Sequence, residues 1–257
     1  ENFWPAWLGE DVPNANVWSL GFGSGISNWF GPSMNLVDMG VNLRATLEAN
    51  GICQRPTIFV CHSFGGLIVK QILRTSSQSD SEGSIANSTA AVVFFSTPHS
   101  GSAQASWTKT FRSLFRPTET TADLLSNSSQ LRDLNQWYQN YTSQKDLMNL
   151  SYFETRKTNG IQIVDQASVD GGVPGNVPIP IDADHRSICK PLTRDDLVYR
   201  LVAGLVARVF EAISDEFEGG RATTASKANE LKQKREIINF PRLLEIEGVY
   251  DSTKISM

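Results

Sequence analysis

The chain has 257 residues and a formal net charge of −4 at neutral pH, from 23 basic and 27 acidic side chains. Its apolar share of 40% is enough for an ordinary globular core, and its length fits one enzyme-sized domain. Acids and bases are interspersed along the chain, so the sequence indicates no basic surface for nucleic acid.

The cysteines and the apolar segments limit the cellular context. Three cysteines, Cys53, Cys61 and Cys189, are too few for a disulfide framework and include no pair spaced for zinc, which favours a reducing, cytoplasmic location. No run reaches the roughly 18 apolar residues that a membrane-spanning helix needs, so we expect no transmembrane span and allow for peripheral membrane contact. The start of the chain does not resemble a signal peptide, and we expect further sequence upstream of Glu1.

Strand and helix patterns alternate along the chain. Strand patterns occupy residues 16–23, 57–62, 90–95, 150–155 and 161–166. Helical apolar spacing covers residues 36–50, 67–74 and 197–213, and we expect the last of these helices to pack on the sheet. The alternation predicts an α/β protein with a mostly parallel sheet and helices on both faces.

The strand at 57–62 leads directly into Ser63, which is followed by Gly65, Gly66 and an apolar helix. This order is typical of a nucleophile elbow, in which a sharp turn from strand to helix lifts a serine hydroxyl above the helix N-terminus. Cys61 stands where the G-x-S-x-G pattern has its first glycine, and cysteine is small enough for the turn. The alternative is a buried strand followed by an ordinary glycine-containing turn. Because all the parts arrive in the required order, we interpret Ser63 as a nucleophile.

A serine nucleophile needs a histidine to take its proton, and the chain has three histidines. His62 directly precedes Ser63, so the alternation of side chains along a strand predicts that it points away from the nucleophile. His99 follows the strand at 90–95, and we assign His62 and His99 to the surrounding pocket. His185 follows the last predicted strand, which matches the Ser, acid, His order of α/β-hydrolases, and we predict that it is the base.

The carboxylate that orients the base has two candidates. Glu154 ends the strand at 150–155 and lies between Ser63 and His185 in the chain, so it is our first choice. Asp165 ends the next predicted strand and is the alternative acid. Asp182 and Asp184 are so close in sequence to His185 that we expect them to be solvated loop carboxylates.

The oxyanion of the reaction needs backbone donors. We predict that the N–H of Phe64, the residue after the nucleophile, is one of them. The second donor would come from the loop after an earlier strand, and the chain begins downstream of that strand. No metal or organic cofactor is needed for this chemistry.

Two regions lie outside the predicted strand and helix alternation. Residues 102–147 are amphipathic and rich in aromatic side chains, and they form either a lid over the site or helices packed on the sheet. We assign residues 1–217 to the α/β domain. Residues 218–257 begin near a glycine pair and become charged, which is typical of a linker or tail that leads to a further domain.

Five motifs between residue 3 and about residue 212 resemble the serine-active-site (lipase-like) α/β-hydrolase family. They are Trp7-Leu8-Gly9-Glu10-Asp11-Val12-Pro13, Val60-Cys61-His62-Ser63-Phe64-Gly65-Gly66-Leu67, Ser96-Thr97-Pro98-His99-Ser100-Gly101, Phe153-Glu154-Thr155 and Ala183-Asp184-His185-Arg186-Ser187-Ile188-Cys189-Lys190. The resemblance implies that Ser63 is the nucleophile, His185 the base and Glu154 the acid, with Thr97, Pro98 and His99 near the pocket. Two departures stand out: Cys61 and Phe64 alter the usual Gly-His-Ser-Leu-Gly-Gly elbow, and this chain opens downstream of the family's His-Gly strand end. Either that segment precedes Glu1 or the oxyanion hole is incomplete.

The resemblance also implies a function. Members of this family are associated with the hydrolysis of lipids or esters, so we expect a small-molecule or lipid ester substrate, including phospholipids. Similar domains occur alone or in front of a nucleotide-binding NLR-type module. The competing hypothesis is therefore a catalytically dormant α/β-hydrolase domain that serves as a binding or signalling module of a longer protein.

Overall fold

The computed structural model of the protein describes residues 3–12, 14–20, 35–78, 83–99, 128–145, 147–160, 162–164 and 166–221. The chain forms two compact units. The central unit comprises Gly23–Lys190, and the terminal unit combines Glu1–Phe22 with Pro191–Met257. All the residues predicted for the active site belong to the central unit.

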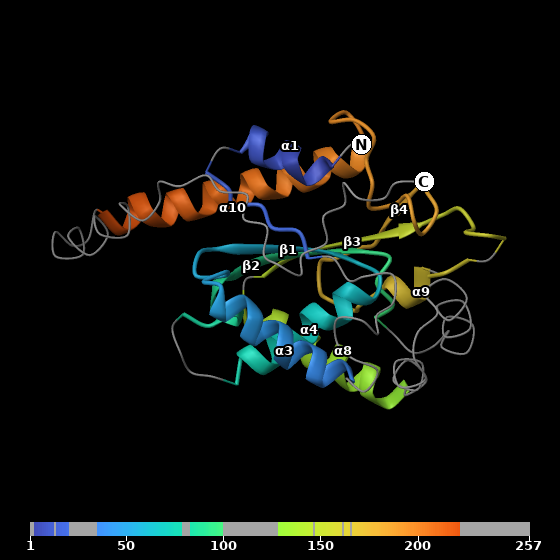
Figure 1. Ribbon diagram of the computed structural model, residues 1–257, viewed down its shortest axis with the longest axis horizontal. Coiled ribbons are helices and arrows are strands. Elements are labelled where there is room, and N and C mark those ends of the chain that lie inside the picture. Colours follow the sequence, from blue (N-terminus) through green and yellow to red (C-terminus); the bar gives the residue numbers. More distant parts are fainter. Residues whose placement is uncertain are drawn as a thin grey trace. The chain divides into compact units, whose positions relative to one another are not determined.

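The central unit contains a four-stranded parallel sheet (Figure 1). In spatial order its strands are β1 (Thr57–His62), β2 (Thr89–Phe95), β3 (Met148–Glu154) and β4 (Ile179–Ile181). Residues 91–95 of β2 are all buried, as expected for a continuous apolar run in a parallel sheet. The prediction of an α/β protein with a parallel sheet is confirmed.

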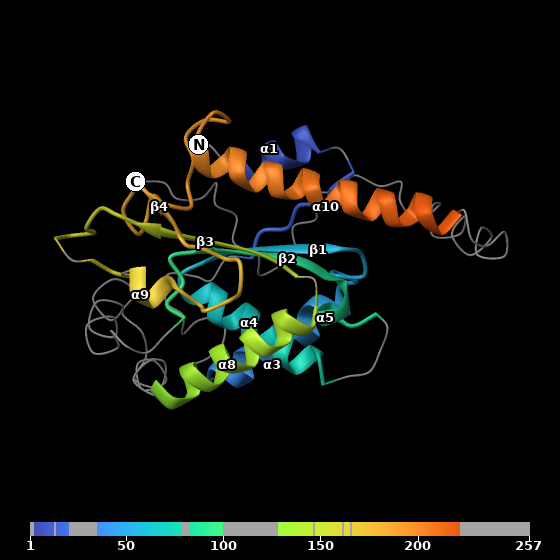
Figure 2. The same ribbon diagram turned by 180° about the vertical axis from the view of Figure 1, so that it is seen from behind.

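Three helices, α3 (Leu36–Ala49), α4 (Phe64–Ser76) and α8 (Ser128–Gln144), lie on the same face of this sheet (Figures 1 and 2). Helix α3 begins where the side chain of Asn35 accepts hydrogen bonds from the N–H groups of Val37 and Asp38, and it ends before Gly51, which has a φ of 66°. Helix α4 packs against α3, α8 and β1. The short helices α5 (Ile85–Ser88) and α9 (Gln166–Val169) complete the central unit.

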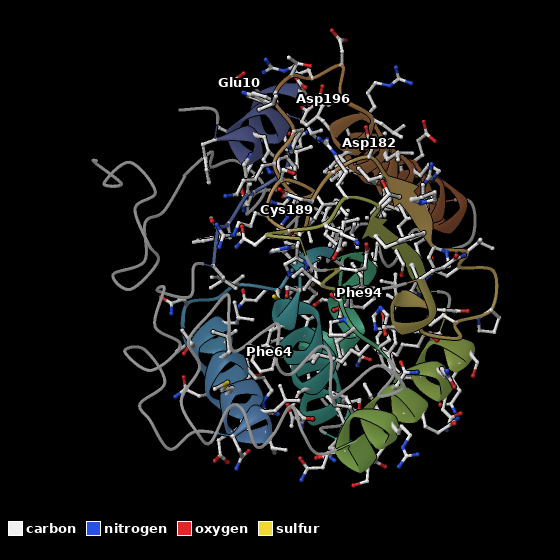
Figure 3. All side chains as sticks on the ribbon, turned by 90° about the vertical axis from the view of Figure 1, so that its right-hand side faces the viewer. Glu10, Phe64, Phe94, Asp182, Cys189 and Asp196 are labelled. Carbon is white, nitrogen blue, oxygen red and sulfur yellow. The ribbon has the colours of Figure 1, made fainter. Side chains whose placement is uncertain are left out.

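Helix α8 is attached to α4 by a buried lysine. Lys70 of α4 is fully buried, its Nζ donates a hydrogen bond of 2.7 Å to Asn135 Oδ1, and it lies 4.6 Å from the centre of the Tyr138 ring. Burial lowers the pKa of Lys70 well below its usual value. Phe94 of β2 lies in the same interior, edge-on to Tyr138 (Figure 3). Within the predicted lid, residues 128–144 are therefore a helix packed on α4, while residues 102–127 lie outside the described residues.

The terminal unit contains α1 (Trp4–Asp11) and α10 (Leu197–Arg221). The Tyr199 ring packs edge-on against Trp7 at 5.5 Å, and its hydroxyl is hydrogen-bonded to Asp11. The carboxylate of Asp196 accepts hydrogen bonds from the N–H groups of Leu192 and Thr193, which fixes the turn before α10. Among the described helices, none combines the length and the apolar content needed to cross a bilayer.

Some predicted elements differ from the structure. Residues 16–20 form no strand, and the rest of that prediction, 21–23, lies outside the described residues. The strand predicted at 161–166 is wrong: residues 162–164 are a loop and α9 begins at Gln166. Ile163 and Val164 are buried in that loop, which accounts for their apolar side chains. The N–H of Val164 donates a hydrogen bond to the Glu154 side chain and not to a neighbouring strand.

Strand β4 and the C-terminal end of α10 were also not predicted. Strand β4 begins in the Gly/Pro-rich passage and contains Pro180. Proline has no N–H to donate to a neighbouring strand, so sheets tolerate it mainly in edge strands, and β4 is the last strand in the order of the described sheet. Helix α10 continues through the glycine pair to Arg221, inside the predicted tail. The remainder of that tail, 222–257, lies outside the described residues, and the boundary at 217 stays a prediction.

The turn after β1 predicts a large cost for any side chain at Gly66. An added Cβ would lie 2.3 Å from Thr97 Oγ1 and 2.8 Å from Phe94 Cδ1, in a fully packed interior. We expect Gly66→Ala to lower the free energy of unfolding by about 1–3 kcal/mol, as overpacking does. Gly204→Ala in α10 is the control, because a Cβ there meets open space. Urea denaturation should show Gly204→Ala unchanged or stabilised by up to about 1 kcal/mol; equal losses in both variants would contradict this account of the turn.

Candidate active site

Ser63 occupies the sharp turn between β1 and α4. Its φ of 54° and ψ of −125° lie in a region that non-glycine residues rarely adopt. Its N–H donates to the carbonyl of Phe95 at 2.8 Å, and its carbonyl accepts from Thr97 Oγ1 at 3.0 Å. Ser63 is therefore held by hydrogen bonds with Phe95, the last residue of β2, and with Thr97, which follows that strand. Its side chain is directed out of the helical path.

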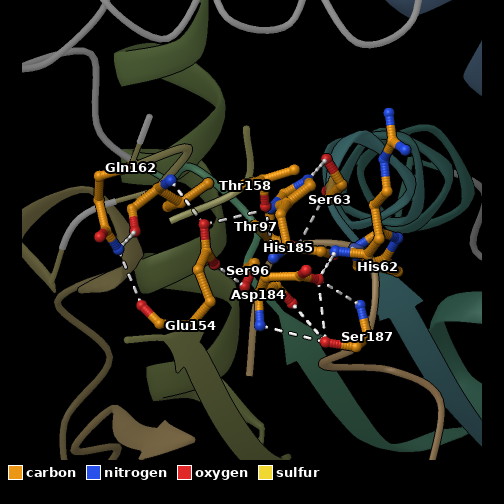
Figure 4. A network of polar contacts seen from close by, with 12 residues as sticks. His62, Ser63, Ser96, Thr97, Glu154, Thr158, Gln162, Asp184, His185 and Ser187 are labelled. Atoms are coloured by element: carbon orange, nitrogen blue, oxygen red, sulfur yellow. Dashed lines mark hydrogen bonds and ion pairs between the residues drawn. The ribbon is translucent and has the colours of Figure 1, made fainter. Parts of the chain in front are cut away.

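The Ser63 hydroxyl lies 3.0 Å from Nε2 of His185. His185 comes from the loop after β4, more than 120 residues further along the chain, and it is fully buried. Its backbone N–H donates to Thr158 Oγ1 at 3.0 Å. Figure 4 shows the His185 ring between Ser63 and Glu154.

The other ring nitrogen of His185, Nδ1, lies 3.3 Å from Glu154 Oε1. Glu154 is the last residue of β3 and is fully buried. The same oxygen accepts a hydrogen bond of 2.8 Å from the N–H of Val164, and Ser96 Oγ donates to Oε2. A buried carboxylate needs such donors, and these three groups supply them.

The parallel sheet explains why these residues meet. His62, Phe95 and Tyr152 are paired across β1, β2 and β3, so the next residues of β1 and β2 leave the sheet at one edge, close to the end of β3. Ser63 and Ser96 directly follow β1 and β2, and both have positive φ values. The carboxyl edge of a parallel sheet is the usual place for a site in α/β proteins.

The remaining predicted residues have different surroundings. The His62 side chain bonds to His185, with 2.7 Å between Nε2 and the carbonyl oxygen of His185, rather than to the Ser63 hydroxyl. His99 is buried edge-on to Phe94, and both of its ring nitrogens are without a hydrogen-bond partner among the described residues. Burial, and then the charge of Lys70, hold the pKa of His99 well below its usual value.

Phe64 begins α4 and is buried, which places its backbone at the N-terminal end of the helix. Asp165, the alternative acid, lies outside the described residues. Asp182 is exposed and pairs with Arg156, while Asp184 accepts the N–H groups of Arg186 and Ser187. Those hydrogen bonds, from Ser187 first, lower the pKa of Asp184.

Sequence reasoning did not identify Ser96, Thr158 and Val164 as neighbours of the predicted triad. Ser96 and Thr97 form a buried polar pair directly after the apolar run 90–95, and that contrast was the available signal. Val164 acts through its backbone, for which a sequence carries no signal. Within the described ranges, no group of three or more His, Cys, Asp or Glu side chains could hold a metal ion.

The Ser96 hydroxyl is predicted to matter for stability. Ser96→Ala leaves one buried oxygen of Glu154 without the donor that it now has, so we expect a loss of about 1–3 kcal/mol in the free energy of unfolding. Ser77→Ala is the matched control, since the Ser77 hydroxyl bonds to the carbonyl of Arg74 at the exposed surface. Its effect should stay within about 0.5 kcal/mol in the same urea titration. A Ser96→Ala variant as stable as the control would contradict the assignment.

The burial of His62 predicts a pH-dependent stability. Desolvation foremost, and then the neighbouring His185, lower the pKa of His62 from 6.5 to about 4. Between pH 4 and pH 6.5 the unfolded chain therefore binds more protons at His62 than the folded chain does. The contribution of the neutral His62 to the free energy of unfolding is complete above about pH 6.5 and is lost as the pH falls towards 4. We expect His62→Gln, which cannot titrate, to reduce the loss of unfolding free energy between pH 6.5 and 4 by about 1–3 kcal/mol. Identical pH slopes for the two proteins, measured by urea denaturation, would exclude this contribution.

Comparison with known proteins gives a consistent set of relatives. The chain is similar to Protein SERAC1 of Danio rerio, with 32% identity over 230 residues that make up 85% of this chain and 34% of the relative. Protein SERAC1 of Mus musculus is 30% identical over 207 residues, and that of Homo sapiens 28% over 225 residues. The chain spans about a third of the length of these curated relatives. No protein-family model matches it. Most of this chain is thus homologous to a part of Protein SERAC1. Its parallel sheet and helices are compatible with an α/β-hydrolase.

Proposed function

We propose that the protein is a serine hydrolase that cleaves a carboxylic ester through an acyl-enzyme on Ser63. One observation carries the proposal: a continuous series of polar contacts runs from Ser63 Oγ to His185 Nε2 at 3.0 Å and from His185 Nδ1 to Glu154 Oε1 at 3.3 Å. These are the contacts that a hydroxyl nucleophile, a base and an orienting carboxylate need.

In this mechanism each residue has one role. The carboxylate of Glu154 holds the proton of His185 on Nδ1, which leaves Nε2 free to take the proton of Ser63. Ser63 Oγ then attacks the ester carbonyl, and the N–H of Phe64 at the start of α4 donates to the developing oxyanion. His185 returns its proton to the leaving alcohol, and the acyl-enzyme is released when a water molecule attacks by the same route. The mechanism requires no metal or organic cofactor.

The class of substrate is proposed from weaker support. The family resemblance favours a lipid or another acyl ester, including phospholipids, and the aromatic residues of segment 102–147 favour an apolar acyl group. The name of the homologues states no substrate. The three free cysteines support a reducing, cytoplasmic location, with any membrane contact peripheral. A continuation into an NLR-type module stays a prediction.

A dormant domain is the second candidate, and the burial of the nucleophile favours it. Ser63 is only 3% exposed, and an ester carbonyl must reach its hydroxyl. A domain kept for binding would retain the fold and the buried polar contacts but would turn over no ester.

Ester turnover separates the two candidates. We expect the purified protein to hydrolyse p-nitrophenyl butyrate, and Ser63→Ala to lower kcat/KM on the order of 1000-fold or more, because no other group replaces the nucleophile. Ser77→Ala, a change at an exposed serine, should leave turnover unchanged. Circular dichroism would verify that each variant is folded. Turnover that is absent from the folded parent protein would support the dormant candidate. Turnover that is undiminished in Ser63→Ala would contradict an acyl-enzyme on Ser63.

A further inference from the structure

The main chain of His185 is held on both sides by side chains. Its N–H donates to Thr158 Oγ1 at 3.0 Å, and its carbonyl oxygen lies 2.7 Å from Nε2 of His62. The adjoining turn is held by Asp184, whose side chain accepts from the N–H groups of Arg186 and Ser187 and whose carbonyl accepts from the N–H of Ile188 at 3.0 Å. The contact with His62 thus ties the His185 carbonyl to the end of β1.

We propose that His62 is a positioning residue for the base, and that its Nε2–H fixes the His185 carbonyl so that the imidazole of His185 reaches the Ser63 hydroxyl. This inference rests on the proposed function. His62 and Ser63 are consecutive residues, so the end of β1 contacts both the main chain and the ring of His185. Figure 4 shows His62 beside His185. The centres of their imidazole rings lie 4.9 Å apart.

The chemistry of the contact determines the protonation of His62. A carbonyl oxygen only accepts hydrogen bonds, so Nε2 of His62 carries a proton. Because the pKa of His62 is lowered to about 4, the ring is neutral at pH 7. A neutral ring also suits the reaction, because His185 becomes positively charged when it takes the proton of Ser63, and a second cation 4.9 Å away would oppose that step. Burial first, and then the charges of His185 and Lys190, lower the pKa of His62. The hydrogen bond to the His185 backbone and the charge of Glu154 oppose this by raising the pKa.

Two substitutions separate the hydrogen bond from the rest of the side chain. His62→Gln places an amide N–H close to the position of the present Nε2, whereas His62→Asn ends near the position of Nδ1 and cannot reach the carbonyl. Both variants are polar, uncharged and unable to titrate. They differ only in whether the donor reaches His185.

We expect His62→Asn to lower kcat for p-nitrophenyl butyrate about 10 to 100-fold, because a small displacement of the base has costs of this size. KM should change less than about 3-fold, because the proposed role of His62 is to position the base and not to bind the ester. His62→Gln should keep kcat within about 5-fold of the parent protein. Equal activity in all three proteins, or equal losses in Gln and Asn variants, would overturn the proposal.

A second measurement is independent of turnover. The proton between His185 Nδ1 and Glu154 should give a low-field NMR signal that is kept in His62→Gln and is broadened or shifted in His62→Asn. If Ser63→Ala shows that the parent has no serine-dependent turnover, the proposed function fails, but this signal still reports whether His62 positions the base. An unchanged signal in His62→Asn would contradict the role of His62.

Discussion

The left-handed backbone at Ser63 is the constraint on which the rest of the candidate site depends. A non-glycine residue in such a conformation costs on the order of 1–3 kcal/mol, so neighbouring groups must impose it. The carbonyl of Phe95 and the hydroxyl of Thr97 bond to its two backbone groups, and the missing side chain of Gly66 leaves room for Thr97. The strain is thus offset by contacts between β2 and the start of α4, and its result is a serine side chain outside the helix.

The parallel sheet then brings distant parts of the chain to this turn. Because β1, β2 and β3 end at one edge, the nucleophile, the serine that supports the acid and the acid itself arise from three neighbouring strands. Ser96 and Thr97 connect these parts directly: the first donates to Glu154 and the second to the carbonyl of Ser63. The dipeptide after β2 therefore links the acid to the turn that holds the nucleophile, although neither residue would take part in bond making.

The sequence predicted those features that follow from local order. A strand, a serine, two glycines and an apolar helix follow one another between residues 57 and 74 and predict the turn. Chain order favoured His185 as the base and Glu154 over Asp165 as the acid, and the structure places His185 between Ser63 and Glu154. Features that depend on long-range contacts were not predictable. Ile163 and Val164 have the apolar side chains of a strand, but these side chains are apolar because they are buried in a loop. The hydrogen bond from His62 to His185 joins residues 123 positions apart, which no local pattern indicates.

Labelling with a fluorophosphonate, followed by mass spectrometry of the modified peptide, tests the central claim most directly. The reagent reacts with a serine whose proton is taken by a base, so it reports the activated nucleophile without any assumption about the natural ester. The account predicts a single modified residue, Ser63, and loss of labelling in a folded His185→Ala variant. A folded protein that remains unlabelled, or is labelled at Ser63 equally well without His185, would contradict it.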